Sequence, residues 1–392
     1  MADQIINTAR GTENINTDRR VVDMSDTISL LKPRVYPLTV LLKKLNKKTT
    51  HNFRFEWLED DLMARWTAIN NGGTAYTATT TDLVVDDASI IAVNDLIKSV
   101  TTGEIMKVTA VDTGTNTITV IRGYGETTAD ANSVADNEKL LVVGNAMMQG
   151  SGAPAEKYNS TVTQYNFTQI FKTPFSVTNT LDKMKLYGGK ELARLRKKKA
   201  IEHGQSIEYA LLFGERNQDT SGSQPVTTTG GVLRFLSGTT NVTTLDTSTT
   251  TNKTDQKKSL DAWIEQLFTY GSDTKTWLCS PSVITWLQTL AEDKLQLIQA
   301  DMDKTYGLNI TRYMTPHGVL NIVHHPLLVQ GYSGYSIALD LEELAYRPLT
   351  GRDTKLKTNI QLPDEDGRRD MYITEAGLEL KHPSKHGIFI VK

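Results

Sequence analysis

The histidines near residue 324 are the side chains that could most readily do chemistry. His324 and His325 are adjacent, His317 lies a few residues before them, and Asp340 follows downstream. Imidazole and carboxylate groups can bind a metal ion or transfer a proton. Adjacent residues on a strand, however, point to opposite faces, so His324 and His325 cannot easily share one ion. We expect these histidines to have a structural role.

Acidic residues form a second group, in the segment Pro-Asp-Glu-Asp-Gly at 363–367, which is followed by Arg368 and Arg369. Carboxylates could bind calcium, but the segment is too short for a twelve-residue calcium loop and has no ligand at its end. We interpret it as an exposed turn with complementary charges that could face another subunit.

Cys279 is the only cysteine, which excludes a disulfide within the chain and a thiolate metal cluster. We expect it to be a small buried hydrophobic residue on a strand. Trp286, Tyr332 and Tyr335 could stack on nucleic-acid bases, but without neighbouring basic residues they are expected in the core.

The sequence motifs of common enzymes are absent. The chain has no G-x-S-x-G, H-E-x-x-H, P-loop or dinucleotide-binding pattern. The glycines of the segment 122–125, Arg-Gly-Tyr-Gly, form a turn without a helix after it. We therefore predict no catalytic residues, no cofactor and no metal, and a protein that is not an enzyme.

The whole-chain composition is that of an ordinary soluble protein. The 392 residues include 43 Lys and Arg against 45 Asp and Glu, so the formal charge of -2 gives no general attraction to nucleic acid or to acidic membranes. The length allows two or three domains. No apolar run is long enough to cross a membrane, and the polar N-terminus is unlike a signal peptide, so no membrane partner is expected.

A long helix is the clearest element that the sequence predicts, and it lies within the segment 180–215. Its apolar residues fall near one face at 3.6 residues per turn: Leu181, Met184, Leu192, Leu195, His203, Ile207, Ala210 and Phe213. Lys190, Arg194, Lys197 and Glu208 are expected on the opposite, solvent face. Because a Gly-Gly pair interrupts the pattern at 188–189, the continuous helix is predicted over 190–213.

A basic run lies on this predicted helix, and it consists of Arg194, Arg196, Lys197, Lys198 and Lys199. These side chains could contact nucleic acid, but helical spacing scatters them around the cylinder. We favour a solvated or intersubunit face.

The N-terminal third is expected to be extended. Residues 1–23 have too few large apolar side chains to fold alone and are predicted to be an arm that lies on a neighbour. Pro33 and Pro37 favour an extended, turning path over 28–45. Phe53, Phe55 and Trp57 alternate as in a strand.

A small β module is predicted over about 72–146, inserted into the surrounding domain. Strands are expected at 82–85, 96–99, 104–111, 117–121 and 140–143. The segment 108–120 is a hairpin, because Asp112, Gly114 and Asn116 suit its turn.

The remaining segments alternate helices and strands, which predicts an α+β fold. Strands are expected at 161–177, 276–279 and 387–391, and helices at 259–270 and 282–292. The threonine-rich segment 239–254 is predicted to be a surface loop.

Six segments together carry a family resemblance. They are Thr-Leu-Asp-Lys-Met-Lys-Leu-Tyr-Gly-Gly-Lys-Glu-Leu-Ala at 180–193, Ile-Glu-Tyr-Ala-Leu at 207–211, His-Pro-Leu-Leu at 325–328, Ala-Leu-Asp at 338–340, Arg-Pro-Leu-Thr-Gly-Arg-Asp at 347–353 and Ala-Gly-Leu at 376–378. In these segments the chain resembles the major capsid proteins of tailed bacteriophages in the SU10-like family, which in turn resemble the Hong Kong 97 (HK97) capsid fold.

The resemblance implies a domain plan. It assigns 1–23 to an N-terminal arm, 24–157 to an extended-loop region that includes the β module, and 158–230 to a peripheral domain whose spine helix is 190–213. It assigns 231–346 mostly to an axial domain, and 347–392 to strands that return to the peripheral domain. The plainest version of this fold has a simple hairpin where this chain has a β module, so extra interlocking contacts or a decoration role are expected of that module.

The resemblance also implies the function and the partners. It predicts a structural shell protein that forms hexamers and pentamers of an icosahedral or elongated head around double-stranded DNA, bound without sequence specificity. Scaffold, portal and cement proteins are possible partners, and assembly is expected in the bacterial host cytoplasm. Some relatives are linked by lysine–asparagine bonds, but Lys98, Lys107 and Lys139 are expected to be solvated. The alternatives are an encapsulin-like compartment shell and a tail or adhesin protein.

Overall fold

The computed structural model describes residues 36–154, 156–186, 189–291 and 310–392. The chain divides into two compact units, Met1–Trp57 with Gln164–Lys392, and Leu58–Thr163. The second unit is therefore an insertion into the first, and we call it the inserted unit. Both units contain strands and the first also contains the α-helices, so the predicted α+β class is confirmed. The predicted arm at 1–23 lies outside the described residues.

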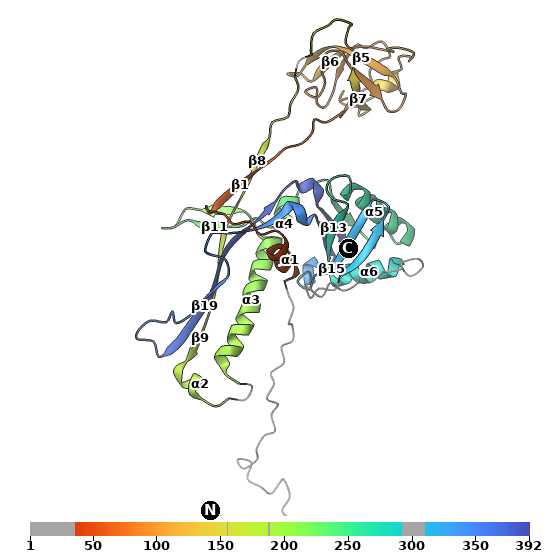
Figure 1. The fold of residues 1–392 in the computed structure, drawn as a ribbon. Helices are drawn as coiled ribbons and strands as arrows, with labels where there is room; N and C mark the ends of the chain where they lie inside the picture. The colour runs from red at the N-terminus through yellow and green to blue at the C-terminus, as the bar shows by residue number, and fades with distance from the viewer. Residues whose placement is uncertain (1–35, 155, 187–188, 292–309) are drawn as a thin grey trace, which may run out of the picture. The chain divides into compact units, whose positions relative to one another are not determined.

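A six-stranded mixed sheet forms one part of the first unit (Figure 1). Its strands, in spatial order, are β12 (Val242–Leu245), β20 (Gly387–Val391), β16 (Tyr335–Leu339), β13 (Thr274–Cys279), β15 (Gly318–His324) and β14 (Ile310–Thr315). The β12–β20 and β13–β15 pairs are parallel and the others are antiparallel. The expectation of a loop throughout 239–254 is wrong, because β12 lies within it. β20 supplies backbone partners to this threonine-rich segment, and Cβ-branched residues suit a strand.

Both faces of this sheet are buried. Trp277, Cys279 and Phe389 face a core that they share with α5 (Lys253–Leu267) and α6 (Pro281–Ala291). The alternate residues Leu278 and Ile388 face a second core on the other side. A strand that is buried on both faces has a continuous apolar sequence, and this explains the run at 387–391.

The second core also contains helices and a smaller sheet. The sheet consists of β17 (Leu344–Pro348), β18 (Lys355–Lys357), the long β19 (Gly367–Leu380) and β9 (Gln169–Thr178). The predicted helix at 190–213 is confirmed as α3 (Glu191–Phe213), which lies beside β9 and β19 (Figure 1). A separate short helix, α2 (Asn179–Lys183), precedes it.

The extended path predicted over 28–45 is wrong where the structure describes it. Residues 37–45 form the helix α1 (Pro37–Leu45), in which Leu38 and Leu42 are fully buried. Pro37 occupies the first helical turn. Backbone N–H groups there have no acceptor within the helix, so the missing N–H of proline costs no hydrogen bond, and its fixed φ suits the helix. The proline therefore starts a helix here.

The smaller elements complete the first unit. They are α4 (Val232–Leu236), the hairpin strands β10 (Asn217–Asp219) and β11 (Val226–Thr228), and the 3-10 turns η4 (Gln330–Tyr332), η5 (Leu341–Glu343) and η6 (Pro383–Lys385). The strands β1 (Arg54–Glu59) and β8 (Val162–Phe167) pair with each other where the chain passes between the units. Strands were predicted at both places, and Phe55 and Trp57 of β1 are buried.

The inserted unit is a six-stranded antiparallel sheet with its own core. In spatial order its strands are β2 (Trp66–Ala68), β7 (Lys139–Asn145), β4 (Asp95–Ser99), β5 (Ile105–Asp112), β6 (Thr117–Ile121) and β3 (Asp82–Val84), with a 3-10 turn η3 (Ala131–Val134). The five predicted strands are confirmed, and so is the hairpin, in which Asn116 has a φ of 53°. No helix in the described part of the chain is long and apolar enough to cross a membrane.

Candidate functional site

Glu208 is the centre of a buried polar site in the first unit. Its carboxylate accepts hydrogen bonds from the backbone N–H groups of Leu38 (2.8 Å) and Thr39 (2.7 Å), from the Thr39 hydroxyl, and from Nε2 of His325 (2.8 Å). Leu38 and Thr39 lie in the first turn of α1, which has no side-chain cap of its own from Tyr36. The carboxylate on α3 thus satisfies the free N–H groups of α1 and carries the negative charge that a helix N-terminus favours.

The solvent position expected for Glu208 is therefore wrong. Its side chain is fully buried, together with Ile207, Leu211 and Leu212 of the same helix. The sequence did contain a signal, because residue 208 lies one helical turn before Leu211 and Leu212. A carboxylate inside an apolar stripe indicates a buried partner, and here the partner is α1.

His325 contacts this carboxylate, whereas its neighbour His324 is exposed. The opposite orientations expected of the two histidines are confirmed. Nδ1 of His325 is buried and has no hydrogen-bond partner among the described residues. A neutral ring with its proton on Nε2 satisfies this arrangement best, because it leaves no N–H without an acceptor. His325 thereby joins the end of β15 to α3 and α1.

The other residues of the expected histidine group lie elsewhere. His317 is exposed in the β14–β15 turn. Asp340 accepts hydrogen bonds from the backbone of Ser272 (2.9 Å) and Glu342 (3.2 Å), and its own N–H donates to Nδ1 of His386 (3.0 Å). In the part of the chain that the structure describes, no three His, Cys, Asp or Glu side chains are placed to bind a metal ion.

A second buried site surrounds Lys275. Its ammonium group donates to the backbone carbonyls of Leu267 (2.6 Å), Tyr270 (2.7 Å) and Lys385 (2.6 Å), and burial lowers its pKa to about 8. His386 lies nearby, donates from Nε2 to a backbone carbonyl and accepts at Nδ1, so its ring is neutral. Burial lowers the pKa of His386 to about 4. The side chains of Lys275 and His386 therefore hold the surrounding loops in place by hydrogen bonds to their backbone atoms.

Charged pairs connect α3 to the long strand β19. Asp370 is fully buried and binds Arg196 (2.8 Å) and the backbone N–H of Asn359 (3.0 Å). Burial opposes ionisation of Asp370, but these hydrogen bonds outweigh it and lower its pKa.

His203, also on α3, forms hydrogen bonds with the hydroxyls of Thr173 (2.9 Å) and Thr374 (2.8 Å), and burial lowers its pKa to about 4.

Ion pairs also occupy much of the basic run on α3. Arg194 binds Glu191, and Lys199 binds Glu202 at 2.6 Å, whereas Lys197 is exposed. With Arg196 bound to Asp370, the run presents less free positive charge than its sequence suggests.

Glu104 and Arg122 form the corresponding buried pair of the inserted unit. Two parallel hydrogen bonds of 2.8 and 2.9 Å join the guanidinium to the carboxylate. The carboxylate also accepts hydrogen bonds from the backbone N–H groups of Gly123 (2.9 Å) and Asp130 (3.1 Å). Burial alone would raise the pKa of Glu104. The hydrogen bonds from Arg122 and from the loop N–H groups outweigh this effect and lower the pKa to about 2. The pair fixes the loop between β6 and β7.

The expected aromatic group separates in the structure. Tyr332 and Tyr335 meet edge to face at 5.0 Å, and Phe213 packs on Tyr332 at 4.5 Å, but Tyr332 is 40% exposed. Trp286 lies in the other core, where it packs on Phe389. Tyr332 is therefore not the core residue that was expected.

Two further predictions concern single places in the fold. Cys279 is fully buried on β13, as predicted, and burial raises the pKa of its thiol. Residues 363–366 form an exposed turn, as predicted, and Gly367 begins β19.

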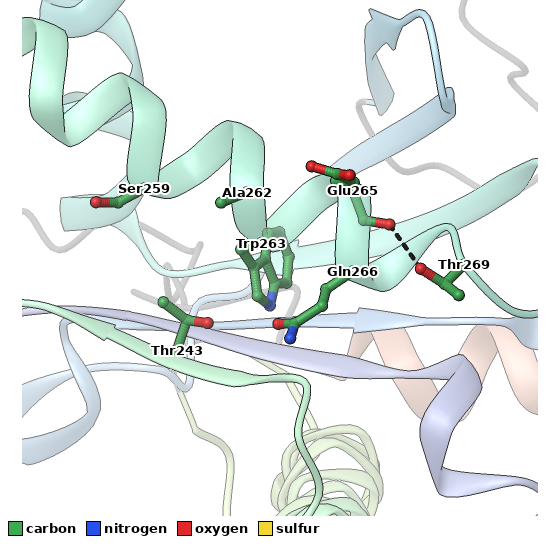
Figure 2. A pocket seen from close by; sticks show the side chains of 7 residues that line it. All are labelled: Thr243, Ser259, Ala262, Trp263, Glu265, Gln266 and Thr269. Atoms are coloured by element: carbon green, nitrogen blue, oxygen red, sulfur yellow. Dashed lines mark hydrogen bonds between the residues drawn. The ribbon is translucent and has the colours of Figure 1, made fainter. Parts of the chain in front are cut away.

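A pocket of about 500 Å³ lies between α5 and β12 (Figure 2). Its lining residues are Thr243, Ser259, Ala262, Trp263, Glu265, Gln266 and Thr269. The indole N–H of Trp263 already donates to Asn241 at 3.1 Å, and the Thr269 hydroxyl donates to the backbone carbonyl of Glu265 at 3.0 Å. Glu265 is the one ionisable residue in this lining, so the pocket lacks an acid and base pair.

Comparisons with known proteins identify a family and several similar proteins. The model of the family described as "SU10 major capsid protein" matches residues 6–391. A protein of Pseudomonas phage PaMx41, described as "Major capsid protein", is 25% identical over 286 residues, which cover 71% of this chain and 68% of the relative. Two similar solved structures are that of Mycobacterium phage Cain, at 8% identity, and the capsid of a native GTA particle, at 10% identity. Each has a TM-score of 0.49, and each alignment covers 99% of this chain and 99% of the other chain.

Proposed function

The chain belongs to the SU10 major capsid protein family, and from this premise we propose that its copies associate into hexamers and pentamers that close a phage head around double-stranded DNA. The observation that carries the proposal is the family match over residues 6–391, because it covers nearly the whole given chain. The protein is a structural component of a phage capsid and not an enzyme. Its α+β architecture agrees with the HK97-like fold that the resemblance implied.

The family membership also decides between the alternatives. A tail or adhesin protein and a cellular compartment shell both remained open from the residues alone. The description of the family and of the phage relative is that of a major capsid protein, so the capsid is the supported function.

We propose the following domain roles for the shell. Residues 1–23 would be an arm that lies on a neighbouring subunit, and 24–157 an extended-loop region that contains the inserted sheet. Residues 158–230 would form the peripheral domain around α3, and 231–346 most of the axial domain around the six-stranded sheet. Residues 347–392 would return to the peripheral domain. The pairing of β19 with β9 and of β20 with β12 and β16 supports the idea that the C-terminal strands serve both regions.

The buried sites support a role in holding one subunit shape. The subunits of a closed shell repeat the same contacts, so each subunit must keep the same shape. Glu208 joins α1, α3 and the end of β15, and Asp370 joins α3 to β19. α1 begins at Pro37, after the segment 1–23 that is proposed as the arm, and Glu208 would hold this helix on α3.

Contact with packaged DNA is proposed to be weak and without sequence specificity. Arg194 and Arg196, which could have offset phosphate charge, are paired with Glu191 and Asp370. Scaffold, portal and cement proteins are further proposed partners, and assembly would take place in the cytoplasm of the bacterial host.

Expression of the chain alone, followed by sedimentation and negative-stain electron microscopy, tests the proposal. Closed shells, tubes or capsomer rings are the expected products. A stable monomer or trimer across a range of salt and crowding conditions would contradict self-assembly.

A further inference from the structure

The inserted unit is strongly acidic, whereas the rest of the chain is basic. Residues 58–163 include six Lys and Arg against fourteen Asp and Glu, a formal charge of -8. Because the whole chain carries -2, the remaining sequence carries +6. Within the inserted unit, Arg122 pairs with Glu104 and Lys157 pairs with Asp95. The other four cations, Arg65, Lys98, Lys107 and Lys139, form no ion pair within the described residues.

Three of these cations lie on one face of the six-stranded sheet. Residues that are directly paired across strands share a face, as do residues two apart on one strand. Lys98 pairs with Leu141 on β7 and with Ile105 on β5, and Leu141 in turn pairs with Trp66. Lys107 is two residues after Ile105, and Lys139 is two residues before Leu141.

This surface, the lysine face, combines positive charge with exposed apolar groups. We define it by Trp66, Lys98, Ile105, Lys107, Ile121, Lys139 and Leu141. Ile121 belongs to it because it pairs with Lys107. Trp66 is 55% exposed and Ile121 is 50% exposed. The opposite face forms the core of the unit, with Ile97, Met106, Val108 and Leu140. A sheet face that exposes a tryptophan beside aliphatic residues has the apolar groups of a binding surface, and the lysines around them add a positive charge that can select a partner.

Acidic residues gather at one end of the same sheet, where β5 turns into β6. Asp112 begins this turn and pairs with Thr117, which pairs with Val84 on β3. Asp86 and Asp87 follow β3, and Asn116 of the turn accepts the N–H groups of Val85 (2.9 Å) and Ala88 (3.3 Å), so the two segments pack together. We call Asp86, Asp87 and Asp112 the acidic end. All three are exposed and none forms an ion pair within the described residues.

We propose that the lysine face of one copy binds the acidic end of the inserted unit of a second copy. The inference rests on the proposed function, since it names the surfaces by which subunits of the shell contact each other. The two surfaces are different parts of the same unit, so the contact is heterologous. Repetition of a heterologous contact around a rotation axis closes a ring. Opposite charges set its orientation, and the apolar residues of the lysine face are covered by it.

The test uses charge reversal in the full-length chain. One variant reverses the lysine face with Lys98→Glu, Lys107→Glu and Lys139→Glu. The second reverses the acidic end with Asp86→Lys, Asp87→Lys and Asp112→Lys. The third carries all six substitutions, and it has the formal charge of the wild type, so it is the matched control. The assembled fraction is measured by sedimentation at low and high salt, and circular dichroism verifies that each variant is folded.

Each single-surface variant is expected to lower the assembled fraction by about fivefold at low salt, because like charges then face each other across the contact. The six-substitution variant is expected to assemble within about twofold of the wild type, since attraction is restored with the signs exchanged. Unchanged assembly in either single-surface variant would overturn the proposal. So would a six-substitution variant that assembles no better than the other two, because the lysine face would then have another partner.

The same experiment separates this contact from the proposed function. If the wild type forms shells and the variants do too, only the contact fails. If the wild type forms no shells, the proposed self-assembly fails. The contact is then tested on small oligomers, which the single-surface variants should abolish and the six-substitution variant should restore.

Discussion

Glu208 illustrates how a single buried carboxylate can determine the position of a helix. Four donor atoms from two distant parts of the chain converge on it: those of Leu38 and Thr39 in α1 and of His325 after β15. A buried charge is tolerated only when its hydrogen bonds are satisfied, and here the donors include the N-terminus of a helix. Loss of the carboxylate leaves N–H groups buried without acceptors, which is costlier than loss of a surface ion pair.

The substitution Glu208→Ala is expected to lower the free energy of unfolding by about 3 kcal/mol, because it leaves buried donors unsatisfied. Urea unfolding of the unassembled chain measures the change. Glu202→Ala on the same helix is the control, since Glu202 is partly exposed and binds Lys199 at the surface. A change of less than about 0.5 kcal/mol is expected there. Equal effects of the two substitutions would show that the contacts of Glu208 do not stabilise α1.

Acid is expected to destabilise the subunit through His203 and His386. Burial lowers the pKa of each ring to about 4 in the folded state, whereas an unfolded histidine titrates near about 6.5. Between these values the unfolded chain binds more protons, so the free energy of unfolding falls as the pH falls. Each histidine contributes a slope of roughly 1 kcal/mol per pH unit in that window.

Urea unfolding at pH 7, 6 and 5 measures this slope. His203→Gln keeps one donor and one acceptor for Thr173 and Thr374 but cannot titrate. It is expected to reduce the slope by roughly 1 kcal/mol per pH unit. His317→Gln is the control, because His317 is exposed. A slope that is the same in both variants would contradict the assignment to His203.

At the scale of elements, the end of α3 depends on two backbones that approach closely. Gly214 follows the last residue of α3, and its carbonyl accepts the N–H of Gly231 at 2.7 Å. A Cβ at Gly214 would lie 2.4 Å from the carbonyl oxygen of Ala210 and 2.5 Å from that of Thr229. Backbone atoms cannot move aside as a flexible side chain can, so only glycine fits.

Gly214→Ala is therefore expected to destabilise the chain by about 3 kcal/mol or more, because overpacking forces backbone shifts. Gly331→Ala is the matched control, since a Cβ there would contact nothing within 4 Å. The control is expected to change stability by less than about 1 kcal/mol, with either sign. Thermal unfolding of both variants decides, and a Gly214→Ala chain as stable as the control would contradict the close approach.

At the scale of the whole molecule, the chain contains separate cores. The inserted unit has a core of its own, which includes Leu83, Ile97 and Ile118, while the first unit has two cores on either side of its larger sheet. A unit of this size with its own core can unfold independently of the rest. Multi-unit chains then depart from two-state unfolding.

Calorimetry of the unassembled chain is expected to show two transitions, one for each unit. Glu104→Ala removes the partner of Arg122 inside the inserted unit and should lower one melting temperature by roughly 10 °C or more. Glu208→Ala should lower only the other. A single transition that both substitutions shift equally would contradict independent units.

The sequence by itself determined the elements whose signal is local. The 3.6-residue period predicted α3, alternation and turn residues predicted the strands of the inserted unit, and the apolar run at 387–391 predicted β20. Local backbone preference and side-chain period act within a few residues, so they can be read without the fold. The lack of catalytic motifs and the resemblance of six segments likewise came from the residues alone.

The tertiary structure alone decided what depends on distant segments. It turned the segment after Pro37 into a helix, placed β12 beside β20, and buried Glu208, which was expected in solvent, against α1. The partners of Glu208 lie about 170 and 117 residues away in sequence. Burial and hydrogen bonding are properties of an environment that distant residues build, so the period of one helix cannot specify which polar group that environment will accept.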